Sequence, residues 1–174
     1  TYALRCASDM ALAYGRDWEA LRYRNLAERV GQAVMKACWS GQRGMLADTP
    51  QKKLFTQHAN ALAILLDLVP PAEQQKLFAK ITQEKDVVRA TFYFQFYVLE
   101  AMRHSGLGEN YMRMLGPWHD MIRHGLTTFS ENPEPTRSDC HAWSASPAWG
   151  FLSSVCGIRP ASPGFRTVRM EPAL

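Results

Sequence analysis

The 174-residue sequence lacks several patterns that mark particular classes of protein. Its four cysteines lie far apart and form no CxxC pair, which argues against a zinc site or a disulfide scaffold. No apolar run approaches the roughly 18 residues that span a membrane, and no signal-peptide pattern opens the chain. We therefore expect free thiols, no metal ion or other cofactor, and no membrane partner.

Clustered basic charge is also missing. The net charge of +4 comes from 20 basic and 16 acidic residues, which are scattered along the chain. A nucleic-acid site needs a basic stripe or patch, so we expect no nucleic-acid partner. Four apparently unpaired cysteines favour a reducing compartment, which predicts a cytoplasmic protein and leaves export of the parent protein open.

What the sequence does contain is a series of apolar, helix-forming segments. Hydrophobic residues make up 47% of the chain and aromatic residues 11%. Periodicity and Gly or Pro breakers predict about seven helices. Their expected ranges are 1–14, 18–38, 57–69, 71–81, 89–104, 109–124 and 144–156. An extended tail should follow, with Phe165, Val168 and Met170 on a strand.

The predicted helices alternate in character along the chain. The first, third, fifth and seventh are apolar nearly all round, and those between them are amphipathic. Fully apolar helices are usually buried, so the alternation predicts an inner and an outer layer of helical hairpins. The expected fold is therefore all-α, part of an α/α barrel. Seven helices are too few to close a six-hairpin barrel, so we expect a fragment of a longer protein.

The richest supply of reactive groups lies from Gly125 to Pro147, after the sixth predicted helix and into the start of the seventh. Glu131 sits there between a Thr-Thr-Phe run and a Pro-rich loop. Hydrolysis of a glycosidic bond needs two carboxyl groups, and aromatic rings stack on sugars, so Glu131 is a candidate catalytic residue with Trp118 and Trp143 as candidate sugar contacts. The alternative is a surface loop glutamate.

Two histidines have similar alternatives. His141 either donates to a substrate hydroxyl or partners Glu131, or it is a hydrogen-bonded core residue beside Trp143. His58 opens an apolar helix, where it either faces a central cavity or joins a hydrogen-bond network at the helix start. Ser138 and Asp139 beside His141 supply the residue types of a hydrolase triad, but they are too crowded to form its geometry, and no GxSxG motif occurs.

Five motifs in this order resemble the catalytic barrel of the α-L-rhamnosidases of glycoside hydrolase family 78, over most of the chain. Trp118 lies between the second and third. The motifs are Gln57–Ala63 (QHANALA), Tyr93–Ala101 (YFQFYVLEA), Gly125–Glu131 (GLTTFSE), Ser138–Ala145 (SDCHAWSA) and Gly157–Pro160 (GIRP), which leads into Pro163–Phe165.

The resemblance implies a six-hairpin (α/α)6 barrel and an inverting mechanism acting on a rhamnose-containing glycoside. Glu131 matches the family's general base and His141 its rhamnose-binding histidine. The family's general acid lies in an Asp- and Arg-rich motif that does not occur here. Ser130 stands where the family often has Trp, and the loop from Glu131 to His141 is short.

These implications give a division of the chain and a set of rival functions. Residues 1–160 would be the C-terminal portion of the barrel, and residues 161–174 the start of a β-sandwich. We expect the isolated chain to be inactive and to self-associate through exposed apolar surface. The alternatives are a non-catalytic helical domain that binds carbohydrate or another partner, and an α/α-barrel glycosidase for another sugar.

Overall fold

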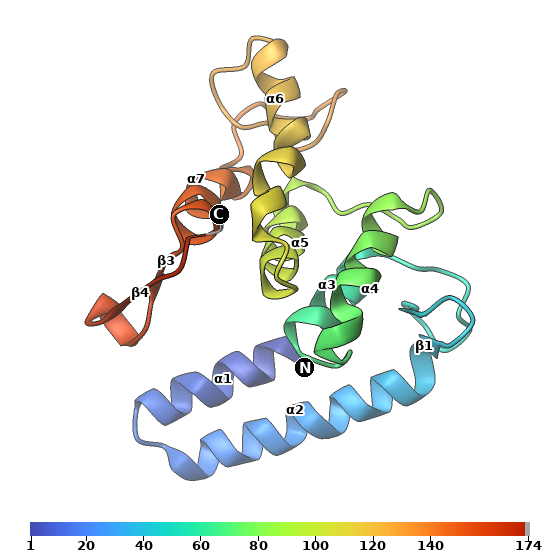
Figure 1. Cartoon of the computed structure of the whole chain (residues 1–174), viewed down its shortest axis with the longest axis vertical. Coiled ribbons are helices and arrows are strands. Elements are labelled where there is room, and N and C mark those ends of the chain that lie inside the picture. The colour runs from blue at the N-terminus through green and yellow to red at the C-terminus, as the bar shows by residue number, and fades with distance from the viewer. Residues whose placement is uncertain (173–174) are drawn as a thin grey trace. The chain divides into compact units, whose positions relative to one another are not determined.

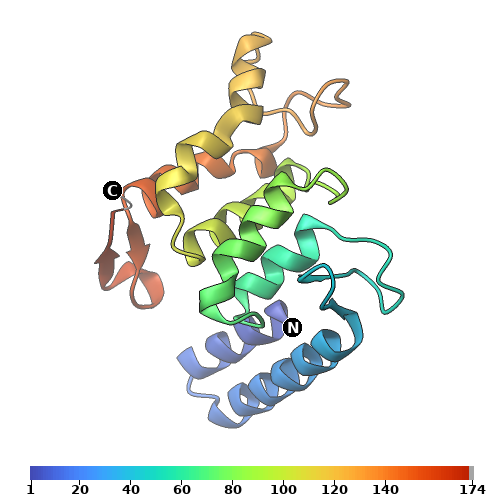
Figure 2. The same ribbon diagram turned by 45° about the vertical axis from the view of Figure 1, so that its right-hand side comes forward.

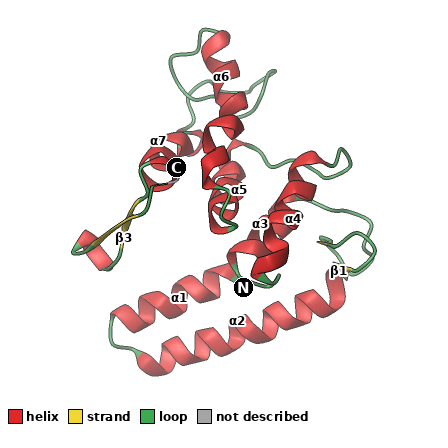
Figure 3. Ribbon diagram, in the orientation of Figure 1, coloured by secondary structure: helices red, strands yellow, loops and turns green. Residues whose placement is uncertain are grey.

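The computed structural model describes residues 1–172, which divide into one compact unit, Thr1–Val88, and a second that begins at Arg89. The all-α prediction is confirmed, because these residues form seven α-helices joined by short 3-10 or π-helical segments and two small β-hairpins (Figure 1, Figure 3). None of the helices in this range is long and apolar enough to cross a membrane.

The first unit opens with a helical hairpin of α1 (Tyr2–Ala13) and α2 (Asp17–Cys38) (Figure 1). Gly15 turns the chain between them with φ 69°, as expected of a helix-capping glycine. The prediction that the first helix is buried on all sides is wrong here. Its buried residues are Ser8 and Ala11, because α2 is its main contact within the described residues and covers one face.

A short hairpin of β1 (Trp39–Ser40) and β2 (Met45–Leu46) follows α2 and was not predicted. The side-chain amide of the fully buried Asn60 fastens β2 to the next helix. Its oxygen accepts from the Leu46 amide at 2.8 Å, and its nitrogen donates to the Leu46 carbonyl at 2.8 Å. Asn60 thus pairs with Leu46 as a neighbouring strand would.

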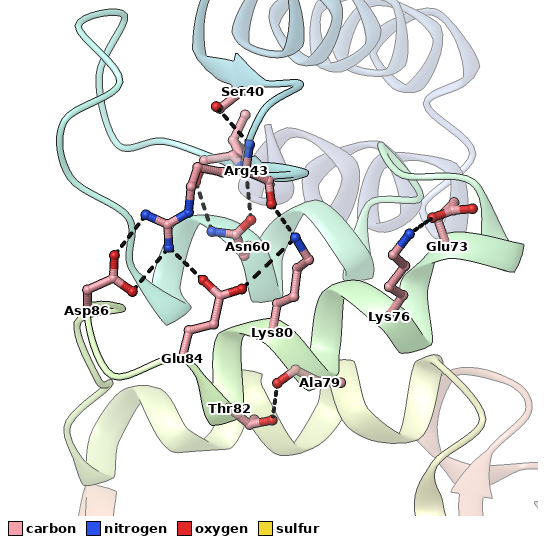
Figure 4. Close-up of polar contacts among 11 residues, drawn as sticks. Ser40, Arg43, Asn60, Glu73, Lys76, Ala79, Lys80, Thr82, Glu84 and Asp86 are labelled. Atoms are coloured by element: carbon pink, nitrogen blue, oxygen red, sulfur yellow. Dashed lines mark hydrogen bonds and ion pairs between the residues drawn. The ribbon is translucent and has the colours of Figure 1, made fainter.

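Arg43 holds the turn of this hairpin (Figure 4). Its guanidinium donates to Asp86 at 2.8 and 3.1 Å and to Glu84 at 2.6 Å, and it lies 4.8 Å from the ring centre of Phe55. These hydrogen bonds lower the pKa of the Asp86 carboxyl, with Arg43's charge adding to the effect. Arg43 therefore ties the hairpin to the segment that follows α4.

Helices α3 (Gln57–Leu65) and α4 (Pro71–Gln83) lie side by side in a second helical hairpin (Figure 2). The third helix ends four residues before its predicted end at residue 69. Asp67 takes the left-handed conformation with φ 52°, and the Leu68 amide then bonds back to Ala63 at 3.0 Å. Pro71 occupies the first turn of α4, as predicted.

The second unit is built on α5 (Phe92–His104), whose buried residues are Phe92, Val98, Leu99, Ala101 and Met102. A 3-10 helix, η1 (Gly108–Leu115), and α6 (Gly116–Arg123) replace the single helix predicted over 109–124. Tyr111, Leu115 and Trp118 form the predicted apolar stripe and are buried. Ile122, predicted on the same stripe, is 73% exposed, although it lies one turn after the buried Trp118 in the same α-helix. The difference therefore lies in what packs on each residue and not in the helical period.

Three short segments replace the helix predicted over 144–156. They are the 3-10 turn η2 (Ala142–Ser144), α7 (Ser146–Gly150) and the π-helical η3 (Phe151–Val155). Gly150 faces the buried ring of Tyr111, and a Cβ atom built there would lie 1.8 Å from the Tyr111 hydroxyl oxygen. Burial raises the pKa of Tyr111 to about 12. The approach of α7 to η1 therefore depends on a glycine.

The tail forms an antiparallel hairpin of β3 (Ile158–Pro160) and β4 (Val168–Met170), joined by η4 (Pro163–Phe165). Val168 and Met170 lie on a strand as predicted, whereas Phe165 lies in the turn with φ 56°. All three are more than half exposed. The assignment of 161–174 to a β-sandwich stays a prediction, as does self-association, and residues 173 and 174 lie outside the described range.

Replacing Gly150 should test the contact between α7 and η1. We expect Gly150→Ala to lower the free energy of unfolding by about 1–3 kcal/mol, because the added methyl group overpacks a filled site. Gly116→Ala is the matched control, since Gly116 is helical and nothing lies within 4 Å of its built Cβ. Thermal denaturation of both variants measures the difference, and equal melting temperatures would contradict the packing argument.

The pKa of Asp86 makes a second prediction, for stability against pH. A depressed folded-state pKa means that the pair with Arg43 stabilises the fold above about pH 4 and that this contribution is lost as the pH falls through the folded pKa. Arg43→Met should therefore reduce the loss of melting temperature between pH 7 and pH 3. Arg24→Met is the control, because Arg24 lies 4.0 Å from Asp9. An identical acid response in wild type and Arg43→Met would refute the assignment.

Candidate active site

Glu131 and His141 lie in the long loop that follows α6 (Figure 3), whereas Trp118 lies in α6 and Trp143 in η2. Gly125 ends α6 with φ 77°, and the Leu126 amide bonds back to Met121 at 3.1 Å. A left-handed residue at this position is most easily supplied by glycine. The chain is thereby turned out of the helix just before the Thr-Thr-Phe run.

We call residues 127–141 the site loop, and backbone hydrogen bonds fold it back on itself. The Glu131 amide donates to the Ser138 carbonyl at 2.9 Å, and the His141 amide donates to the Phe129 carbonyl at 2.7 Å. The Thr128 hydroxyl donates to the Asp139 carbonyl. The two arms therefore run antiparallel, and residues ten positions apart in the sequence become neighbours.

The carboxylate of Glu131 is largely covered at the centre of this arrangement. Its side chain is 11% exposed and receives a fork of donors from Arg137. Arg137 Nε lies 2.9 Å from Glu131 Oε2, and Arg137 Nη2 donates to Glu131 Oε1. The guanidinium itself is 77% exposed, so solvent screens the attraction between the two charges.

His141 brings an imidazole to the same carboxylate. Its Nε2 lies 4.0 Å from Glu131 Oε1, and its side chain is 23% exposed. The ring of Trp143 lies 4.7 Å from the imidazole centre, tilted by 33°, and Tyr93 of α5 lies 5.5 Å beyond Trp143. Trp143 and Tyr93 are each about half exposed. A carboxylate, an imidazole and two accessible aromatic rings are thus gathered in one place.

Trp118 has a different position from the other predicted residues. It is 5% exposed, its indole N–H donates to the Ser144 carbonyl at 2.7 Å, and its ring lies 5.4 Å from that of Phe92. In this structure it joins α6 to the turn that follows the site loop and to α5. Its predicted contact with a sugar stays a prediction.

His58 belongs to the first unit, where it is half-buried at the start of α3. Its neighbours form the helix-start network that was one of the two expectations for this segment. Thr56 caps the helix through the Ala59 amide at 3.2 Å, and Gln57 donates to the Ile81 carbonyl at 3.0 Å. The structure thus brings Glu131, His141 and Trp143 together, whereas His58 lies in the other unit.

Two of the site's residues, Arg137 and Tyr93, were missed in the sequence. Arg137 lies six positions from Glu131 across a turn with two prolines, so opposite charges on either side of such a turn were the available signal. Tyr93 offered no signal of its own, because five aromatics crowd the start of α5.

A pocket of about 400 Å³ also adjoins the loop, lined by Ser130, Pro133 and Glu134 among others.

Comparison with protein families gives a match over residues 1–155. The matching model describes the bacterial alpha-L-rhamnosidase six-hairpin glycosidase domain. A search of curated proteins found no match.

Three solved structures are similar to the chain. A rhamnosidase from Klebsiella oxytoca with rhamnose bound matches with a TM-score of 0.76 and 22% identity, over 86% of this chain and 32% of its own. An alpha-L-rhamnosidase from Dictyoglumus thermophilum matches with a TM-score of 0.79 and 22% identity, over 98% of this chain and 20% of its own. An alpha-L-rhamnosidase from Aspergillus terreus matches with a TM-score of 0.75 and 20% identity, over 95% of this chain and 21% of its own.

These comparisons establish the fold. The expected architecture, part of a helical six-hairpin barrel, is confirmed by the family match and by the structural likeness. The chain spans about a third or a fifth of the length of the three structures that it matches.

Proposed function

The chain belongs to the bacterial α-L-rhamnosidase six-hairpin glycosidase family, and from this we propose that the whole protein removes terminal α-L-rhamnose from glycosides with inversion at the anomeric carbon. The observation that carries the proposal is the meeting of Glu131 and His141 of the site loop with Trp143 of η2. The rhamnose bound to the Klebsiella oxytoca enzyme, which shares this fold, supports the choice of sugar.

In the proposed reaction Glu131 is the general base. Its carboxylate takes a proton from a water molecule while the water oxygen bonds to the anomeric carbon. The bond from that carbon to the glycosidic oxygen breaks, and a second carboxyl group protonates the departing oxygen. Inverting enzymes hold the two carboxyl groups roughly 6.5–9.5 Å apart to leave room for the water.

The general acid is not among the residues that we assign in this chain, because the family's Asp- and Arg-rich motif does not occur in its sequence. We therefore propose that this chain contributes the base and part of the sugar site and that the isolated chain is inactive. A partly covered carboxylate beside an imidazole fits the base role, since the base must be held in place until water and substrate arrive.

His141 and Trp143 are proposed to hold the sugar. Trp143 exposes about half of its surface, and aromatic rings bind the apolar face of a pyranose. The imidazole lies against that ring and beside the base, within reach of a hydroxyl group on a sugar that stacks there. The pair can thus orient the anomeric carbon toward the water that Glu131 activates.

Removal of the base is the direct test of this function. In the whole protein, Glu131→Gln should lower kcat on an aryl α-L-rhamnoside by roughly 10²–10⁴-fold, because the amide cannot accept the proton. Glu109→Gln is the control, since Glu109 is exposed and bonded to Asn110. Unchanged kcat in Glu131→Gln would remove Glu131 from the mechanism, and activity on another glycoside alone would show that the sugar is wrong.

The sugar-binding role of His141 gives a separate prediction. His141→Ala should raise KM for the same rhamnoside about tenfold, the loss expected for one hydrogen bond to the substrate, and should change kcat less. His119→Ala serves as the control, because His119 is exposed on α6. A fall in kcat at constant KM would instead mean that His141 acts on the chemical step.

A further inference from the structure

We propose that Arg137 is a positioning residue that orients the carboxylate of Glu131 toward the water molecule that it activates. This inference rests on the proposed function, because it concerns the same general base. Neither the family resemblance nor the sequence pattern assigned Arg137 a role. The contacts that carry it are all within the site loop.

The first observation is the shape of the contact. Arg137 donates through Nε to Glu131 Oε2 at 2.9 Å and through Nη2 to Oε1. Two parallel donors from a rigid planar group fix both the position and the plane of a carboxylate, which a single point charge cannot do. A carboxylate has about four lone-pair sites, so the fork leaves one on each oxygen for water.

The second observation is that the backbone of Arg137 is itself held. The neighbouring Ser138 carbonyl accepts from the Glu131 amide at 2.9 Å and from the Thr136 hydroxyl at 3.0 Å. The next hydrogen bond between the two arms of the loop runs from the His141 amide to the Phe129 carbonyl at 2.7 Å. Arg137 therefore starts from a fixed point directly across the loop from Glu131, although its guanidinium is exposed.

The third observation is what the carboxylate would keep without Arg137. The remaining polar neighbour in the site loop is His141, whose Nε2 lies 4.0 Å away and thus beyond hydrogen-bond length. Packing would still cover the Glu131 side chain, but no hydrogen bond from another side chain of the site loop would fix the plane of its carboxylate. Arg137 is in this sense the residue that gives the base a defined direction.

Magnitudes separate this role from a merely stabilising one. An exposed ion pair changes the folding equilibrium by about fivefold at most. A displacement of about 1 Å at a reacting group can cost roughly 100-fold in rate. If Arg137 acts by positioning, its removal should therefore change kcat far more than it changes folding.

The test compares kcat and KM of the whole protein on an aryl α-L-rhamnoside. We expect Arg137→Ala to lower kcat by roughly 10- to 100-fold, with KM and melting temperature nearly unchanged. Arg137→Lys, which keeps the charge without the fork, should recover part of the loss. Methylguanidine added to Arg137→Ala should restore activity in a saturable manner. Arg113→Ala is the matched control, because Arg113 is exposed and bonded to Asn110.

A double-mutant cycle identifies the route of the effect. In a Glu131→Gln background, Arg137→Ala should cost little further activity, because the group that it orients is already lost. An equal loss in both backgrounds would overturn the inference, as would an unchanged or raised kcat in Arg137→Ala. A lowered melting temperature with no rescue by methylguanidine would make Arg137 a structural residue. Full activity in Glu131→Gln would instead refute the proposed base, and this inference with it.

Discussion

The pairing of the two arms of the site loop is the constraint on which the candidate site depends. The hydrogen bond from the Glu131 amide to Ser138 and that from the His141 amide to Phe129 bring residues 131 and 141 together. Without them the carboxylate and the imidazole would belong to a flexible connection between helices. The 4.0 Å separation of Glu131 and His141 therefore accompanies the backbone pairing, and it is too long for a hydrogen bond between the two side chains.

Contacts in the rest of the second unit hold the segments that flank the site loop in place. Trp118 donates to the Ser144 carbonyl, so the turn that follows the loop is joined to α6 in the core. Tyr111 packs against Gly150, which brings α7 close to η1. Both aromatic residues are buried, and both bind backbone or approach it closely. Loops carry functional groups well when the scaffold at their two ends is rigid, and these two contacts supply that rigidity.

Much of this fold was predictable because the spacing of apolar residues over a few turns is enough to indicate a helix. Every predicted α-helical segment contains a helix, and Gly15, Gly125 and Pro71 mark helix ends where glycine and proline act through their own geometry. The errors arise from tertiary contacts. The last predicted helix instead forms three segments, and the middle one packs at Gly150 against Tyr111, which lies 39 positions away in the sequence. Ile122 lies on the same face of α6 as the buried Trp118, so its exposure depends on which elements pack there, and amphipathic spacing does not reveal this.

The candidate site likewise contains residues that the sequence indicates and one that only the folded loop reveals. Glu131 and His141 were found from residue types and family motifs, and the loop does bring them together. The contact of Arg137 with Glu131 was missed because it appears only when the two arms of the loop are paired in register.

One consequence concerns how such a site is assembled. Glu131, Arg137 and His141 lie within eleven residues, and the contacts among them belong to one loop. The geometry of the proposed base is then set locally, by the loop and by the scaffold at its two ends. Under the proposed inverting mechanism, the other carboxyl group would need only to stand at the distance that admits one water molecule. On this proposal the loop itself fixes the direction of the carboxylate, and the rest of the barrel has to supply only that one separation.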